Sequence, residues 1–178
     1  SKEYATKYPE TFESSLSDAV VYIGKNKVTD ELEIPGFGAI SVGKLLLSPT
    51  RTYAPLVKAI LTDHFDAVKG MIHCSGGGQT KCMKYLPGNM RIVKDNFMPI
   101  PPIFNLIQAN SGANAREMYQ VFNMGHRLEI FTDASKAENL ISIANSLGID
   151  AQVIGRVEEC SSKELVLKGD FGTEVFNY

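Results

Sequence analysis

Short apolar runs recur along the chain with the length and flanking residues expected of β-strands. They cover residues 20–23, 28–34, 68–72, 90–95, 126–131, 151–157, 165–167 and 174–176. Most are rich in Val, Ile, Leu or Phe, and several have Gly, Pro or Asn at one end, which is typical of strands. The sequence GDFG at residues 169–172 separates the last two runs and predicts a hairpin.

Apolar side chains recur at helical spacing in four other segments, which we predict to be helices. These are residues 53–61, residues 103–109, a stretch that ends near residue 122, and residues 137–147. Expected helix starts are Ser48 or Thr50 for the first, Asn114 with Glu117 for the third, and Ser135 with Glu138 for the fourth. Strands and helices mix without strict β-α-β repetition, which predicts an α+β fold with a mixed β-sheet and about four helices.

The first 40 residues are weakly patterned and have no apolar core of their own. We therefore expect residues 1–40 to be a linking or edge segment from a preceding domain, and residues 41–178 to form the main domain. A chain of 178 residues is long enough to bury one sizeable core.

Composition excludes several classes of protein. The chain is 44% hydrophobic and 21% charged with a net charge of −2, so it has no basic field of the kind that binds nucleic acid. No apolar run is long enough to span a membrane and no signal peptide is visible, so we expect a cytoplasmic protein without membrane partners. The three cysteines, Cys74, Cys82 and Cys160, have no C-x-x-C spacing, which argues against a disulfide framework or a zinc site and predicts reduced thiols and no bound metal.

A glycine-rich stretch follows the predicted strand at residues 68–72 and precedes a short helix that Pro87 ends. Ser75, Gly76, Gly77 and Gly78 present little besides backbone, and a glycine loop between a strand and a helix is suited to binding an anion through its N–H groups. The stretch matches neither G-x-G-x-x-G nor the Walker A motif, so a purely structural turn is the alternative.

Three side chains near this loop or at a helix start could carry chemistry. His73 could donate to a phosphate or move a proton near neutral pH, or could instead be a core histidine bonded to a carbonyl. Cys74 could be a nucleophile, but His73 is its only candidate base, and neighbours on a strand point to opposite faces. Arg51 stands at a predicted helix start, where a cation is favoured only if an anion lies between them; the alternative is a solvated arginine.

Four segments resemble one known family in order and in spacing. They are LLSPTRTY at residues 46–53, GMIHCSGGG at 70–78, MYQVFNMG at 118–125 and IGRV at 154–157. Together, over roughly residues 40–160, they resemble the C-terminal half of aminoimidazole ribonucleotide (AIR) synthetase, also called phosphoribosylformylglycinamidine cyclo-ligase. Residues 41–178 would then be an AIR synthetase-like C-terminal domain.

The resemblance implies an ATP-dependent ligase of purine biosynthesis that closes formylglycinamidine ribonucleotide to aminoimidazole ribonucleotide. It implies that ATP and Mg²⁺ bind mainly to an N-terminal domain without a counterpart here, that the full-length protein forms a homodimer, and that this chain alone is inactive. The alternatives are a related ATP-dependent enzyme (a formylglycinamidine ribonucleotide synthetase, a selenophosphate synthetase or a hydrogenase-maturation protein) or a non-catalytic domain that binds a phosphate ligand.

The resemblance also implies which residues face the substrate. The residues implied to bind substrate or phosphate are Thr50, Arg51, Ser75, Gly76, Gly77, Gly78 and Asn123. His73 would position the substrate or move a proton during ring closure. The sequence departs from the family at residues 81–85, where a usual Asn and Arg are missing and Lys84 offers a charge without bidentate geometry.

Overall fold

The computed structural model describes residues 15–17 and 24–177 of the chain. The strand expected at residues 20–23 lies outside the described residues. The described residues fall into two compact units, one made of residues up to Thr50 together with Pro102–Ala113, the other of Arg51–Pro101 and the residues from Asn114 onward. The expected division at residue 40 stays a prediction.

The first unit contains a small hairpin and two helices. Strands β1 (Glu31–Ile34) and β2 (Gly38–Ser41) pair antiparallel, and helices α2 (Val42–Leu46) and α4 (Pro102–Ser111) complete the unit. The Asn110 side chain accepts a hydrogen bond from the Lys25 N–H at 2.8 Å and donates one to Asn26 Oδ1 at 3.0 Å. These bonds attach α4 to the segment before β1.

The second unit contains two sheets. Strand β3 (Gly70–His73) pairs antiparallel with β5 (Leu128–Phe131). The other sheet has the order β6 (Gly155–Glu159), β4 (Met90–Lys94), β7 (Glu164–Gly169), β8 (Gly172–Asn177) and is mixed, because β4 and β7 are parallel. The expected α+β class is confirmed, as is the hairpin β7–β8 around residues 169–172.

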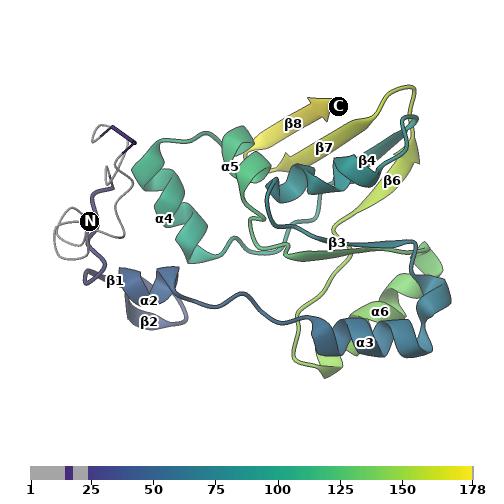
Figure 1. Cartoon of the computed structure of the whole chain (residues 1–178), viewed down its shortest axis with the longest axis horizontal. Helices are drawn as coiled ribbons and strands as arrows, with labels where there is room; N and C mark the ends of the chain where they lie inside the picture. The colour runs from purple at the N-terminus through teal and green to yellow at the C-terminus, as the bar shows by residue number, and fades with distance from the viewer. Residues whose placement is uncertain (1–14, 18–23, 178) are drawn as a thin grey trace. The chain divides into compact units, whose positions relative to one another are not determined.

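The helices of the second unit are α3 (Ala54–Asp63), α5 (Ala115–Val121) and α6 (Ala134–Ser146), with short 3₁₀ helices η2 (Phe65–Ala67) and η3 (Gly78–Tyr85). Helices α3 and α6 lie on one side of β3 and β5 (Figure 1). The core between them consists of Leu56, Ile60, Ala67, Leu140, Ala144 and Ile149, with Met71, Leu128 and Ile130 of the sheet packed against it. Helical spacing on α3 and α6 and period-two spacing on the strands thus bury the same core.

Two of the expected helix starts are wrong. Helix α3 begins after Tyr53 and has no side-chain cap, because residues 48–52 are not helical; only the proline in its first turn helps to start it. Helix α6 begins after Asp133, whose backbone is extended, so Ser135 already lies inside the first turn and cannot cap it. The capping box of Asn114 with Glu117 at the start of α5 is confirmed.

Within residues 15–17 and 24–177, no helix is both long enough and apolar enough to cross a bilayer.

Candidate functional site

The two faces of the β3–β5 sheet have different chemistry. In the register of the pair, His73 lies opposite Leu128, and Ile72 lies opposite Glu129. Because side chains alternate along a strand, His73 points to the face that carries α3, whereas Glu129 points to the other face. The exposed His73 and the buried Glu129 therefore lie on opposite faces of the same two-stranded sheet.

His73 is exposed at the end of β3. Its ring lies edge-on to Tyr53, at 6.2 Å between ring centroids, just before the start of α3. The alternative of a buried core histidine therefore does not apply, and the side chain is free to meet a ligand or to exchange a proton with water.

The glycine loop is anchored at one end and open at the other. Gly76, Gly77 and Gly78 have φ angles of 46°, 106° and 48°, all in the left-handed region that favours glycine. A Cβ at Gly78 would lie 2.5 Å from the Phe122 carbonyl oxygen, whereas a Cβ at Gly76 would meet nothing within 4 Å. The close approach explains the third glycine, and the open end leaves backbone accessible to a ligand.

The other expected site residues are distributed unevenly. Ser75 is exposed in the loop itself. Asn123 is half-buried: its carbonyl oxygen accepts a hydrogen bond from Gln79 Nε2 at 2.6 Å, and its Oδ1 accepts one from the Gly125 N–H at 3.0 Å. Arg51 is exposed two residues before Tyr53, whose ring faces His73. The structure thus joins His73, the loop and Asn123 in the second unit.

Thr50 is the last residue of the first unit and is exposed. Its expected contact with a phosphate is neither supported nor opposed by the geometry of that unit, and stays a prediction.

Cys74, directly after β3, is too deeply buried to be a nucleophile. Cys74 and Cys82 are 2% and 1% exposed. Burial, and then the nearby Glu129 carboxylate, raise the pKa of the Cys74 thiol far above its ordinary value. Since the thiolate is the reactive form, Cys74 is inert near neutral pH.

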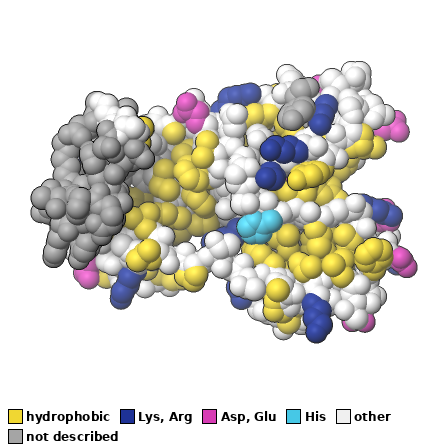
Figure 2. Space-filling view, viewed as in Figure 1, with side chains coloured by type: hydrophobic (Ala, Val, Ile, Leu, Met, Phe, Trp, Pro, Cys, Tyr) yellow, Lys and Arg dark blue, Asp and Glu magenta, His cyan; other side chains and the backbone are white. Residues whose placement is uncertain are grey.

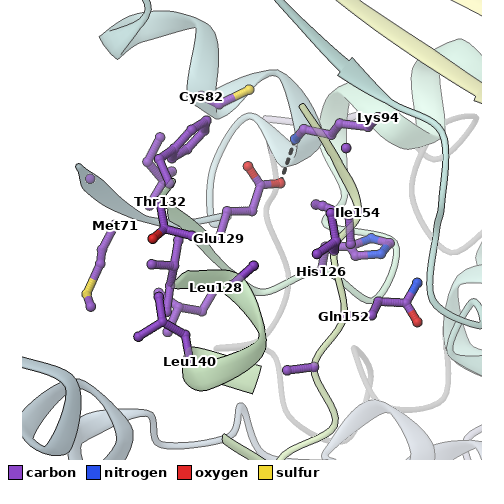
Figure 3. Close-up of a pocket in the computed structure, with 18 of the residues that line it drawn as sticks. Met71, Cys82, Lys94, His126, Leu128, Glu129, Thr132, Leu140, Gln152 and Ile154 are labelled. Atoms are coloured by element: carbon purple, nitrogen blue, oxygen red, sulfur yellow. Dashed lines mark hydrogen bonds and ion pairs between the residues drawn. The ribbon is translucent and has the colours of Figure 1, made fainter. Parts of the chain in front are cut away.

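Three polar side chains are buried behind the glycine loop. Lys94 at the end of β4 is paired with Glu129 of β5, with 2.5 Å between Nζ and Oε1 (Figure 3). Lys94 Nζ also donates to Oε1 and to the carbonyl oxygen of Gln79, at 2.9 Å and 3.1 Å. Burial lowers the pKa of Lys94, but the Glu129 carboxylate more than offsets this, so the pKa lies above its ordinary value and the ammonium stays charged.

His126 is a second buried titratable group and is 4% exposed. Its Nε2 accepts a hydrogen bond from the Met98 N–H at 2.9 Å, so Nδ1 carries the ring proton, and Nδ1 has no hydrogen-bond partner. Burial, and then the charge of Lys94, lower the pKa of His126 to about 4. The ring is therefore neutral at physiological pH and packs edge-on against Phe97 at 5.2 Å.

A cavity of about 1210 Å³ lies within the second unit, and the buried ion pair forms part of its wall. Its other walls are mainly apolar and include Met71, Leu128, Leu140 and Ile154 (Figure 3). His73 and the three glycines do not line it. Because His73 and the loop do not line this cavity, it is separate from the candidate site.

Figure 2 shows apolar side chains gathered over the part of this unit that holds α3 and α6.

No group of three or more His, Cys, Asp or Glu side chains suited to a metal ion occurs among the described residues. We assign no step to a metal on this part of the chain.

The fold and the site define the class of the protein as an α+β domain with a glycine loop between a strand and a short helix. The model of the family "AIR synthase related protein, C-terminal domain" matches residues 15–168. The chain belongs to this family, which confirms the resemblance seen in its four sequence motifs.

Two curated relatives illustrate the similarity. The phosphoribosylformylglycinamidine cyclo-ligase of Methanocaldococcus jannaschii is 37% identical over 80% of this chain and 40% of its own length. The enzyme of that name from Thermoanaerobacter sp. is 32% identical over 78% of this chain and 41% of its own. The chain thus spans about two fifths of the length of these relatives.

Solved structures agree on the fold. Escherichia coli HypE, a hydrogenase maturation protein, aligns with a TM-score of 0.53 at 21% identity, covering 78% of this chain and 44% of that one. A HypE–HypF complex aligns with a TM-score of 0.52 at 17% identity, covering 77% and 48%. At these identities the likeness shows a shared fold alone.

Sequence reasoning missed the buried polar group of Gln79, Lys94 and Glu129. Glu129 stands between two apolar residues, a pattern that predicts a solvent-facing side chain on a half-buried strand. Only the packing of a second sheet over that face buries it, so no signal in the sequence could have identified the pair.

Proposed function

We propose that this chain is the C-terminal part of an ATP-dependent cyclo-ligase that closes formylglycinamidine ribonucleotide to aminoimidazole ribonucleotide in purine biosynthesis. The observation that carries the proposal is an exposed histidine directly before an open glycine loop, in a chain of the AIR synthase related family. Family membership supports this chemistry, and the loop is suited to hold the phosphate on which it depends.

The loop and its neighbours bind a phosphate group of the substrate or of ATP. Ser75 offers a hydroxyl, Gly76 offers unhindered backbone, and the exposed Arg51 side chain supplies a positive charge. Gly77 contributes the backbone that follows Gly76. Asn123 contributes by holding Gln79, the residue after the loop. Thr50 is proposed as a further phosphate contact on the grounds of the family motif.

His73 positions the substrate or moves a proton as the ring closes. Its exposure leaves the ring accessible to substrate, and it lies two residues before Ser75 in the chain. As the family resemblance implies, ATP and Mg²⁺ bind mainly outside this chain.

The remaining parts of the proposal concern the whole protein. The relatives are about twice as long as this chain, which supports a preceding N-terminal domain in the active enzyme. From the family resemblance we also expect that enzyme to be a cytoplasmic homodimer. The 178-residue chain by itself is expected to be inactive.

The test is a rate assay on the polypeptide that contains this chain and the preceding sequence. ADP release is measured with and without formylglycinamidine ribonucleotide, with the 178-residue chain as a control. Substrate-dependent release by the longer protein and none by the shorter chain is the expected result. His73→Ala is expected to lower kcat by about 10²–10⁴-fold, the usual contribution of a proton-transfer group.

His64→Ala is the matched control, because His64 follows the other end of α3 and bonds to Asn139 rather than to the loop. Unchanged turnover in His73→Ala would remove the catalytic role. ADP release that ignores the substrate would favour the alternatives, a formylglycinamidine ribonucleotide synthetase or selenophosphate synthetase type of enzyme, or a non-catalytic phosphate-binding domain.

A further inference from the structure

A single buried ion pair connects the two sheets of the second unit, among the residues described. Lys94 is the last residue of β4, and Glu129 lies within β5. They are 1% and 6% exposed, and their side chains point toward each other from the two sheets (Figure 3). The other ion pairs recorded in this unit involve side chains that are much more exposed.

Every donor of the Lys94 ammonium is used inside the protein. The group has three N–H bonds, and its acceptors are Glu129 Oε1, Gln79 Oε1 and the Gln79 carbonyl oxygen. With no donor left and almost no exposure, Lys94 cannot itself bind a phosphate. Its charge acts on the protein rather than on a ligand.

Gln79 connects the ion pair to the glycine loop. It follows Gly78 directly and is 0% exposed. Its Nε2 donates to the Asn123 carbonyl oxygen at 2.6 Å, while its own carbonyl oxygen also accepts a bond from Cys82 Sγ at 3.3 Å. The residue next to the loop is therefore held on two sides, whereas Gly76 at the open end is held by nothing within 4 Å of its Cβ position.

A buried ion pair is a weak source of stability, because apolar residues of similar volume usually stabilise a core as well or better. Glycines in the left-handed region have no side chains to hold them, so their conformation must be imposed from outside. Three buried side chains can impose that conformation: the Lys94 ammonium, the Glu129 carboxylate and the Gln79 amide next to the loop.

We propose that Lys94 and Glu129 are positioning residues that hold the glycine loop, through Gln79, in its anion-binding conformation. The inference rests on the proposed function, in which the loop binds phosphate. It adds that the loop is ordered before the ligand arrives, so that binding costs little conformational entropy.

The main test removes the pair without leaving an unpaired buried charge. In the double variant K94M/E129L, both charges are replaced by apolar side chains of similar size. Order parameters of the backbone amides from ¹⁵N relaxation are expected to fall at Gly76, Gly77 and Gly78 from about 0.85 to below about 0.6, while strands β4 and β7 keep theirs. The dissociation constant for inorganic phosphate, followed by amide chemical shifts, is expected to rise by about tenfold or more.

A second variant keeps the ion pair and removes the side-chain part of its link to the loop. Gln79→Met deletes the amide group, while the bond from Lys94 Nζ to the Gln79 carbonyl oxygen stays, so the loop is expected to loosen less than in the double variant. The control K69M/D133L removes an exposed Lys–Asp pair of the same unit, at 3.3 Å, and is expected to change neither readout.

Each outcome decides the matter. A folded double variant with an ordered loop and unchanged phosphate affinity would overturn the proposal. A Gln79→Met loop that is looser than that of the double variant would also overturn it, as would failure of both variants to fold, since the pair would then serve only stability. If the wild-type loop is ordered but binds no phosphate, the proposed function loses its anion site, while the order parameters of the variants still test the positioning role separately.

Discussion

Gly78 is the residue of the glycine loop that packs against the backbone at the end of α5. A Cβ there would lie 2.5 Å from the Phe122 carbonyl oxygen and 2.7 Å from that of Tyr119, and φ is +48°. We expect Gly78→Ala to lower the free energy of unfolding by about 2–4 kcal/mol, from left-handed strain and overpacking together. Gly76→Ala has the same type of φ but open space, so about 1–2 kcal/mol is expected from strain alone. Urea denaturation of both variants measures the difference, and equal losses would contradict the close contact.

His126 makes stability depend on pH. Its pKa in the folded protein is about 4, below the 6.5 of an ordinary histidine, because the ring is buried and near Lys94. Between these values the unfolded chain binds a proton that the folded chain does not. Stability is therefore fully present above about pH 6.5 and is lost as pH falls toward 4, by ~3 kcal/mol in all.

His126→Gln keeps an acceptor for the Met98 N–H but does not titrate. The measurement is urea denaturation of both proteins at several pH values from 7.5 to 4. The stability difference between wild type and variant is expected to change across this range and to level off below pH 4. Parallel curves would show that His126 is protonated normally in the folded state.

At the scale of single elements, the pairing of β4 with β6 depends on Gly155. A Cβ at this position would run into the Val93 carbonyl oxygen and come within 2.9 Å of the Lys94 Cα, so the two strands can approach only if residue 155 has no side chain. We expect Gly155→Ala to lower the free energy of unfolding by about 3 kcal/mol, because the added methyl group overpacks the sheet. Amide hydrogen exchange is expected to become faster in β6 than in the hairpin β7–β8.

Gly88→Ala serves as the control for this change, because a Cβ at Gly88 would meet nothing within 4 Å. A loss of protection in both variants alike would mean that the strand contact is not the cause.

At the scale of the whole molecule, Lys94 and Glu129 join the two sheets of the second unit. Removing one partner leaves a buried charge unpaired, so Lys94→Met is expected to destabilise the protein by about 3–5 kcal/mol. K94M/E129L is expected to lie within about 1 kcal/mol of the wild type, because both charges are gone. Thermal and urea unfolding of the two variants test this, and a double variant as unstable as the single one would show that the pair itself stabilises the fold.

Much of this architecture follows from local patterns. Alternation in residues 90–95 predicted β4, the apolar run 165–167 before the hairpin signal predicted β7, and helical spacing predicted the apolar faces of α3 and α6. Local patterns failed where a helix start depended on its surroundings: Ser135 has the right partner three residues later, but the extended backbone at Asp133 begins α6 before it.

The amino-acid sequence by itself determined the α+β class, the family and the position of the glycine loop after its strand, because these depend on residue types and on spacing along the chain. Only the tertiary structure decided which of two neighbours, His73 or Cys74, meets solvent and which charges are buried. The physical reason is that a strand offers two faces, and the alternation along it does not say which face another sheet will cover. The ion pair of Lys94 with Glu129, 35 residues apart in sequence, exists only because that face was covered.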